Sequence, residues 1–158
     1  MQETSELMSR CQERLPLTFP KEERLHHKSL IDKLFKEGKT FYEYPLRVTW
    51  KMWTDKELMS NFRSHLPEGI GKIQVMVSVP KKKRKRAVDR VLLRRRIRET
   101  YRLNRLGLRN SIDANEKIRT MSLAFIYLHD SNISYRVLEE KMIAILRKLI
   151  SKIENMER

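Results

Sequence analysis

The sequence predicts an α+β fold in which helices pack on a small mixed β-sheet. Two stretches, residues 46–52 and 73–79, alternate apolar and polar side chains, as half-buried strands do. Two others, residues 29–38 and 134–153, repeat apolar side chains at helical spacing. A chain of 158 residues, 40% of them hydrophobic, is long enough to bury one core, so we expect a single domain.

The first elements follow from local signals. Residues 1–18 are polar and predict a flexible N-terminal extension. Ser29, with Asp32 three residues on, predicts the start of a short helix, and Gly38 predicts its end. The apolar stripe of this helix consists of Leu30, Ile31, Leu34 and Phe35. A weak additional strand is expected around residues 40–44, before the strand at 46–52.

The second half of the chain supplies the remaining elements. Residues 53–72 are rich in turn-forming residues and predict an irregular connection before the strand at 73–79. A helix is expected from Val88 to Leu106 with Gly107 near its end, then a strand at 121–128 and a long helix at 134–153. We therefore expect one folded α/β domain over residues 19–153 and a tail over 154–158.

Positive charge is concentrated in one segment. The formal net charge is +15 and the isoelectric point is near 10.2. Residues 81–109 contain 14 Lys and Arg but only two acids, Asp89 and Glu99, so this segment carries most of the excess. A polyanionic partner is indicated, because neutralising phosphates releases condensed counterions and so adds affinity.

Helical geometry separates this segment into two faces. At 100° per residue, six arginines fall within an arc of about 100°, and the apolar side chains fall within another. The arginines are Arg94, Arg95, Arg98, Arg102, Arg105 and Arg109, and the apolar residues are Leu93, Ile97, Tyr101 and Leu108. Like charges at i and i+4 destabilise a helix, so this face is better explained as a phosphate-binding surface than as a solvated one.

Several functional classes are disfavoured. One cysteine, Cys11, and four histidines without ligand-like spacing argue against a disulfide framework or a structural zinc site. The first residues lack an apolar signal segment, and the longest apolar runs are about six residues, far below the roughly 20 that a membrane helix needs. The acids are scattered, and adjacent pairs such as Glu22 and Glu23 are expected to be solvated, so no protein-based nuclease site is predicted.

Three alternatives remain open at this point. The run PKKKRKR at residues 80–86 looks like a nuclear import signal, which would suit a DNA-binding factor. The basic helix could also lie on an anionic membrane surface, although its apolar residues equally suit docking on a sheet. A ribosomal or other structural rRNA-binding protein would have the same charge pattern.

The order of several motifs resembles the protein component of bacterial ribonuclease P. The motifs are ERL at 23–25, LFKEG at 34–38, VMVSV at 75–79, Lys81-Lys82 and AVDRVLLRRRIRE at 87–99, and the match extends from about Phe19 to Ile150. The resemblance implies an α-β-β-β-α-β-α sandwich with a left-handed β-α-β crossover. It also implies a cytoplasmic protein subunit without its own catalytic residues or cofactor, which assists an RNA that cleaves the 5′ leader from precursor tRNA with Mg ions.

The resemblance also assigns residues to two RNA partners. Lys81, Lys82, Arg90, Arg94, Arg95, Arg98 and Arg102 would bind the catalytic RNA. Ile31, Phe35, Arg47, Thr49 and Lys51 would line a cleft for the single-stranded leader of precursor tRNA. Neither a protein-bound metal, a membrane nor an obligate protein partner is implied.

The chain departs from this family where the signature helix begins. The family usually has Arg-Asn-Arg, but this chain has Arg90-Val91-Leu92. Val91 falls at 300°, inside the arginine arc, where a polar contact to phosphate is expected. The family's glycine before Ala87 is absent, and the basic run 83–86 replaces it. We expect this run to compensate electrostatically for the missing polar residues.

Overall fold

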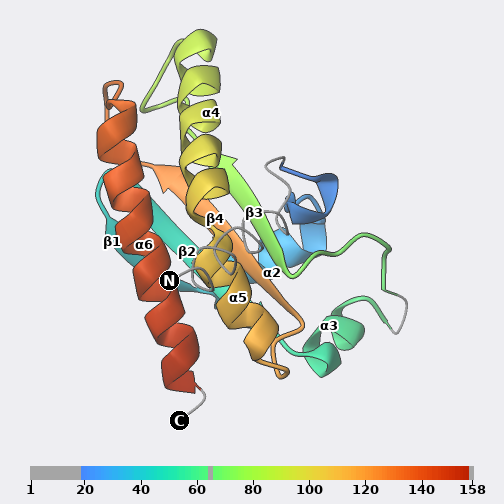
Figure 1. Cartoon of the computed structure of the whole chain (residues 1–158). Coiled ribbons are helices and arrows are strands. Elements are labelled where there is room, and N and C mark those ends of the chain that lie inside the picture. Colours follow the sequence, from blue (N-terminus) through green and yellow to red (C-terminus); the bar gives the residue numbers. More distant parts are fainter. Residues whose placement is uncertain (1–18, 64–65, 157–158) are drawn as a thin grey trace, which may run out of the picture.

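The computed structural model describes residues 19–63 and 66–156, and in this part a four-stranded sheet lies between two layers of helices (Figure 1). The strands are β1 (Lys39–Glu43), β2 (Leu46–Trp53), β3 (Ile73–Ser78) and β4 (Thr120–Tyr127). The helices are the 3-10 turn η1 (Lys21–Glu23), α2 (Lys28–Glu37), α3 (Asp55–Asn61), α4 (Ala87–Asn104), α5 (Leu106–Ala114) and α6 (Tyr135–Met156). The predicted α+β class is confirmed.

The sheet is mixed and has the strand order β1-β2-β4-β3. Antiparallel pairs join β1 to β2 and β2 to β4, whereas β3 and β4 are parallel. Helices α4 and α5 therefore form the crossover between the two parallel strands. The weak signal at residues 40–44 corresponds to β1, while the handedness of the crossover stays a prediction.

Each face of the sheet buries its own apolar cluster. Alternate residues of β2, such as Val48 and Trp50, face α4, α5 and α6 and form the larger core with Phe125 of β4. On the other face, Leu30 and Leu34 of α2 pack in a smaller cluster. The sheet thus separates the basic helix α4 from α2, so the two predicted RNA-binding regions lie on opposite faces.

The short helix α2 begins earlier than predicted and ends where predicted. His27, not Ser29, is its N-cap, and the Ser29 hydroxyl instead accepts a hydrogen bond from Asn61 Nδ2 at 3.1 Å. Gly38 is the C-cap, as predicted. A Cβ atom at Gly38 would lie 2.2 Å from the Leu34 carbonyl oxygen and 3.1 Å from the Thr49 side chain. A side chain here would therefore clash with the last turn of α2 and crowd β2, which explains the glycine.

The prediction of an irregular segment at 53–72 was wrong in part. It contains α3, whose first turn is capped by the Thr54 hydroxyl, which accepts a hydrogen bond from the Glu57 amide at 3.3 Å. The helix is only seven residues long, too short to show a clear apolar period. Its single buried residue, Leu58, packs in the smaller cluster.

The predicted helix at 88–106 corresponds to α4, and a second helix that was not predicted follows it. The α4 helix ends at Asn104, and α5 follows from Leu106, so Gly107 lies inside α5 rather than after a helix. A Cβ at Gly107 would approach the Ile150 side chain of α6 to 3.3 Å, which explains a small residue at this helix contact. The final helix α6 runs to Met156, beyond the predicted end at 153. The N-terminal extension at 1–18, with Cys11, lies outside the described residues.

Candidate RNA-binding surface

The buried side of α4 holds its arginine face outward. Leu93, Ile97 and Tyr101 are fully buried in the larger core, as the helical period predicts. The first turns of α4 extend past the end of the sheet, so they contribute no buried residue before Leu93 (Figure 1). This arrangement presents the opposite side of the helix to solvent.

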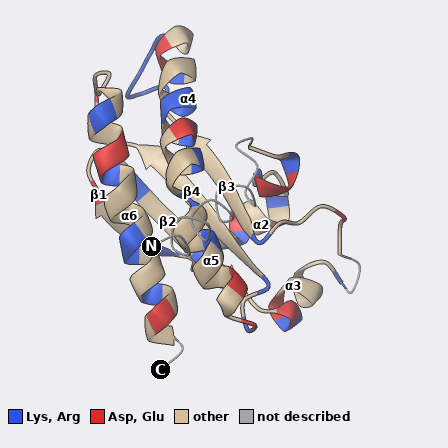
Figure 2. Ribbon diagram, in the orientation of Figure 1, with Lys and Arg blue, Asp and Glu red and all other residues tan. Residues whose placement is uncertain are grey.

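Three arginines form the centre of the exposed face. Arg95 and Arg98 are exposed and Arg94 is half-buried. Within residues 19–63 and 66–156, none of the three forms an ion pair with a carboxylate. Figure 2 shows Lys and Arg gathered along α4 and the loop before it, whereas basic and acidic residues alternate along α6. The positive charge of α4 is therefore available to an anionic partner.

Arg24 adds a fourth cation, which the sequence did not reveal. It lies in an extended segment beside the edge strand β3, where the Leu25 amide donates to the Val75 carbonyl oxygen at 3.0 Å. Burial, followed by the charges of Arg24 and Arg94, lowers the pKa of the Arg98 guanidinium. The sequence could not place Arg24 beside Arg98, because residues 24 and 25 reach this position through a tertiary contact, their pairing with β3. The positive charge of Arg24 was the only signal in the sequence.

Arg102 lies on the same helix but its charge is compensated. Its guanidinium donates two hydrogen bonds to the Glu99 carboxylate, one of them from Nε at 3.0 Å. The hydrogen bond from Arg102 lowers the pKa of Glu99, and the same bond raises the pKa of Arg102. Arg102 is thus a weaker candidate for phosphate binding than Arg95 or Arg98.

Arg105 and Arg109 do not belong to the exposed arc in which the sequence placed them. Arg105 is buried and pairs with Glu23. Glu23 is also buried, so the prediction that it is solvated was wrong. Arg109 lies 3.3 Å from the same carboxylate. Burial raises the pKa of Glu23, and the two arginines oppose this effect. The helix ends after Asn104, so the continuous 100° rotation used in the prediction no longer applies at these positions.

The basic loop before α4 is folded onto the domain. Arg84 donates to the Asp130 carbonyl oxygen at 2.6 Å and to the Asp89 carboxylate at 2.9 Å. Arg90 donates to the carbonyl oxygens of Arg84 and Lys85 at 3.0 and 2.7 Å. Lys81 and Lys82 are exposed. These contacts fix the run next to the first turn of α4, which does not suit an extended import signal.

Val91 and Leu92, the positions that break the expected motif, are partly exposed. They are 39% and 37% accessible, and Val88 beside them is 78% accessible. They lie in the turns that extend past the sheet, so no core contact requires an apolar side chain there. An apolar strip therefore adjoins the basic loop and Arg95.

The residues predicted to bind the leader lie on the other face of the sheet. Phe35 is 44% accessible, and Ile31 is half-buried on the same side of α2. Arg47 of β2 is half-buried, and its Nε has no hydrogen-bond partner among the described residues. Thr49 is buried, with its hydroxyl 3.2 Å from that of Thr40.

Lys51 lies apart from Phe35. It occupies a pocket on the opposite flank of α2, where its ammonium group is 3.4 Å from Glu37 and 3.8 Å from Glu57. The same group lies 4.8 Å from the centre of the Trp53 ring. Lys51 thus joins α2 and α3 to the sheet, and its charge is compensated.

Two absences hold for residues 19–63 and 66–156, the part of the chain that the structure describes. No group of three or more His, Cys, Asp or Glu in this part of the chain could hold a metal ion. None of its helices is long and apolar enough to cross a membrane.

Comparisons with known proteins agree with this geometry. Residues 19–149 match the family described as Ribonuclease P. A Porphyromonas gingivalis protein named ribonuclease P protein component is 33% identical over 129 residues, which are 80% of this chain and 84% of that protein. The solved RNase P proteins of Staphylococcus aureus and Thermotoga maritima share the fold, with TM-scores of 0.56 and 0.54 and sequence identities of 16% and 19%. Each solved structure covers 80% of this chain, and the similarity spans 94% and 96% of the two structures respectively.

Proposed function

The chain belongs to the ribonuclease P protein family, and we propose that α4 and its preceding loop form the surface that binds the catalytic RNA. Proteins of this family are the subunit that assists this RNA in removing the 5′ leader from precursor tRNA by endonucleolytic cleavage. Membership therefore favours this activity over the ribosomal, nuclear and membrane-surface alternatives.

The observation that carries the proposal is the uncompensated charge of Arg94, Arg95 and Arg98. Each is held outward by a helix whose other side is buried, so the charges are fixed before RNA arrives. Guanidinium groups can donate two parallel hydrogen bonds to a phosphate. Lys81, Lys82 and Arg90 extend this surface along the loop, and Arg102 contributes less because Glu99 already faces it.

The chemistry is assigned to the RNA. We place the cleavage site and its Mg ions in the RNA component, and we place no catalytic residue and no metal ligand in this chain. On this assignment the protein acts by binding and positioning RNA, in the bacterial cytoplasm where precursor tRNA is made.

The 5′ leader is assigned to the opposite face of the sheet. The exposed ring of Phe35 offers a surface on which an unpaired base can stack, with Ile31 beside it. The buried Nε donor of Arg47 has no hydrogen-bond partner among the described residues. Thr49 and Lys51 complete the set, although both already have partners within the protein.

Reconstitution tests the assignment of α4. The protein is added to a bacterial ribonuclease P RNA at low magnesium, and release of the leader from precursor tRNA is measured. We expect stimulation by the native protein and its loss in Arg95→Gln/Arg98→Gln. The matched control is Arg136→Gln/Arg147→Gln, which removes two exposed arginines from α6. Equal loss in both variants would contradict the proposal, since only net charge would then matter.

A second measurement tests the leader surface. Phe35→Ala should weaken holoenzyme binding to precursor tRNA by roughly 1–3 kcal/mol and leave binding to mature tRNA unchanged. Val137→Ala is the control, because Val137 is an exposed apolar residue of α6, on the other side of the sheet from this surface. Equal weakening for precursor and mature tRNA would reject the assignment.

A further inference from the structure

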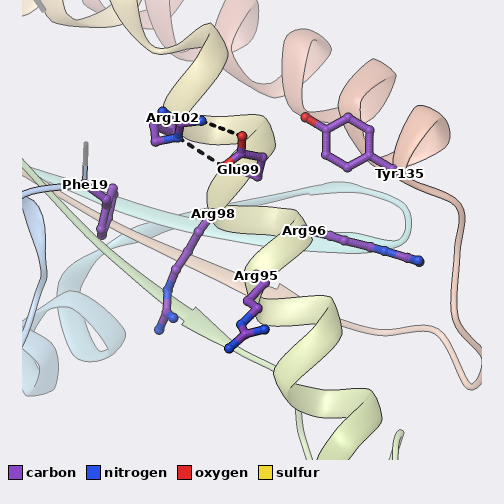
Figure 3. A pocket seen from close by; sticks show the side chains of 7 residues that line it. All are labelled: Phe19, Arg95, Arg96, Arg98, Glu99, Arg102 and Tyr135. Carbon is purple, nitrogen blue, oxygen red and sulfur yellow. Dashed lines mark hydrogen bonds and ion pairs between the residues drawn. The ribbon is translucent and has the colours of Figure 1, made fainter. Parts of the chain in front are cut away.

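A pocket on the flank of α4 combines an aromatic ring with the arginine face. It has a volume of about 430 Å³ and is open to solvent, and Phe19, Arg95, Arg98 and Tyr135 are among its lining residues (Figure 3). Its volume lies within the range of roughly 300–1,000 Å³ that small organic ligands occupy. A single nucleotide is a ligand of this size class.

The Phe19 ring is held in place by the core. It makes an edge-to-face contact with Tyr101, with ring centres 6.1 Å apart and an interplanar angle of 83°. Tyr101 is fully buried, and its ring centre lies 5.9 Å from that of Phe125 in β4. Phe19 itself is only half-buried, so a fixed ring reaches the pocket. A ring fixed in advance loses little conformational entropy when a base stacks on it.

The charges around this ring suit a phosphate group. Arg95 and Arg98 point in the same direction from α4 (Figure 3), and the guanidinium carbon of Arg24 lies over one face of the Phe19 ring, 5.9 Å from its centre. Glu99, the acid of the pocket, is already bonded to Arg102. The cations next to Phe19 therefore remain available, whereas the negative charge is neutralised.

We propose that this pocket binds one unpaired nucleotide of the catalytic RNA, with its base stacked on Phe19 and its phosphate bound by Arg95 and Arg98. The inference rests on the proposed function of α4 and adds to it a nucleotide subsite with an aromatic wall. The catalytic RNA is chosen over the leader because the leader surface at Phe35 lies across the sheet. A simpler role for Phe19, covering Tyr101 from solvent, predicts no effect on RNA.

Substitutions at Phe19 separate the two roles. Phe19→Leu keeps an apolar cover over Tyr101 but removes the ring, and Phe19→Trp keeps a ring. We expect Phe19→Leu to weaken binding to ribonuclease P RNA by roughly fivefold to a hundredfold, and Phe19→Trp to bind within about twofold of the native protein. The salt dependence of binding should not change, because stacking neutralises no phosphate. Phe41→Leu is the matched control, since Phe41 is also half-buried against the larger core but lies on β1.

Three results would overturn the inference. Native affinity in Phe19→Leu would leave Phe19 as a cover for the core. Equal weakening in Phe41→Leu would show a general effect of the substitution. A loss confined to precursor tRNA, with ribonuclease P RNA bound normally, would assign the nucleotide to the precursor. The proposed function fails by a different result, namely unchanged RNA affinity and salt dependence in Arg95→Gln/Arg98→Gln.

Discussion

Arg98 and Arg105 fall on the same side of a continuous helix, yet the structure gives them opposite environments. Arg98 is exposed and has no carboxylate partner in the described part of the chain, whereas Arg105 is buried against Glu23. We therefore expect Arg98→Met and Arg105→Met to differ in kind. The first should weaken RNA binding at nearly constant stability, and the second should destabilise the fold at nearly constant intrinsic affinity for RNA.

The magnitudes follow from burial. Removing one partner of a buried ion pair typically costs about 3–5 kcal/mol, because the other charge remains in a poorly solvated site. Arg109 still lies near Glu23, and Glu23 can take up a proton. The loss of unfolding free energy in Arg105→Met should therefore be near the lower value, about 3 kcal/mol. For a chain of this length, about 3 kcal/mol lowers the melting temperature by roughly 6–12 °C. Arg98→Met, an exposed substitution, should change stability by less than about 0.5 kcal/mol.

Two assays measure this difference. Urea unfolding followed by circular dichroism gives stability, and RNA titrations at several salt concentrations give the slope of log affinity against log salt. Losing one phosphate contact reduces the magnitude of that slope by roughly 0.7–0.9, which we expect for Arg98→Met only. Native stability in Arg105→Met, or a reduction of its salt slope as large as that in Arg98→Met, would contradict these two roles. The double variant Glu23→Leu/Arg105→Met should regain most of the lost stability, since no unpaired charge of this pair remains.

Three further predictions concern other parts of the molecule. Thr54→Ala removes the cap of α3 and should lower the unfolding free energy by about 1 kcal/mol in urea, whereas Thr54→Ser should not; equal loss would exclude the cap as the cause. Burial, and to a lesser extent His26, lowers the pKa of His27 below 6.5, so the unfolded chain takes up a proton at higher pH than the folded protein. Stability should therefore be highest above pH 6.5 and fall as pH decreases through the folded pKa; an unchanged pH dependence in His27→Gln would contradict this. Leu92→Arg places a cation in the exposed strip of α4 and should increase the salt slope of RNA binding by roughly 0.7–0.9 with little change in stability; an unchanged slope would show that this position does not reach a phosphate.

The elements with a long apolar period could be predicted from the sequence. The strands at 46–52 and 73–79 and the long C-terminal helix were located to within a few residues, because each has one face buried along its length. Helix α3 was missed because it buries only Leu58. The break at Arg105 was missed because apolar and basic residues keep nearly the same period through α5. Such a break depends on how two helices fit against α6 rather than on a local signal.

The exposed arginine face of α4 was predicted in outline but not in its limits. The period of α4 identified Arg94, Arg95 and Arg98 correctly as members of one face. It could not identify Arg24 or Phe19, which join this face from a segment at least 70 residues earlier in the sequence. Nor could it show that Glu23 is buried, because a pair of adjacent acids is usually solvated. All three residues lie in the segment 19–24, whose position is set by pairing beside β3.

This segment determines which arginines remain available to RNA. Glu23 lies against Arg105 and Arg109 at the start of α5. Its negative charge therefore compensates these two arginines and not Arg98, which lies two turns away. Arg24, the next residue, contributes its positive charge near Arg98 instead. Two adjacent residues of opposite charge thus divide one basic segment into an internal part and an external part. Exchanging them, as in Glu23→Arg/Arg24→Glu, would place a cation beside two buried arginines and an anion beside the RNA surface, and so should lose both the fold and the binding.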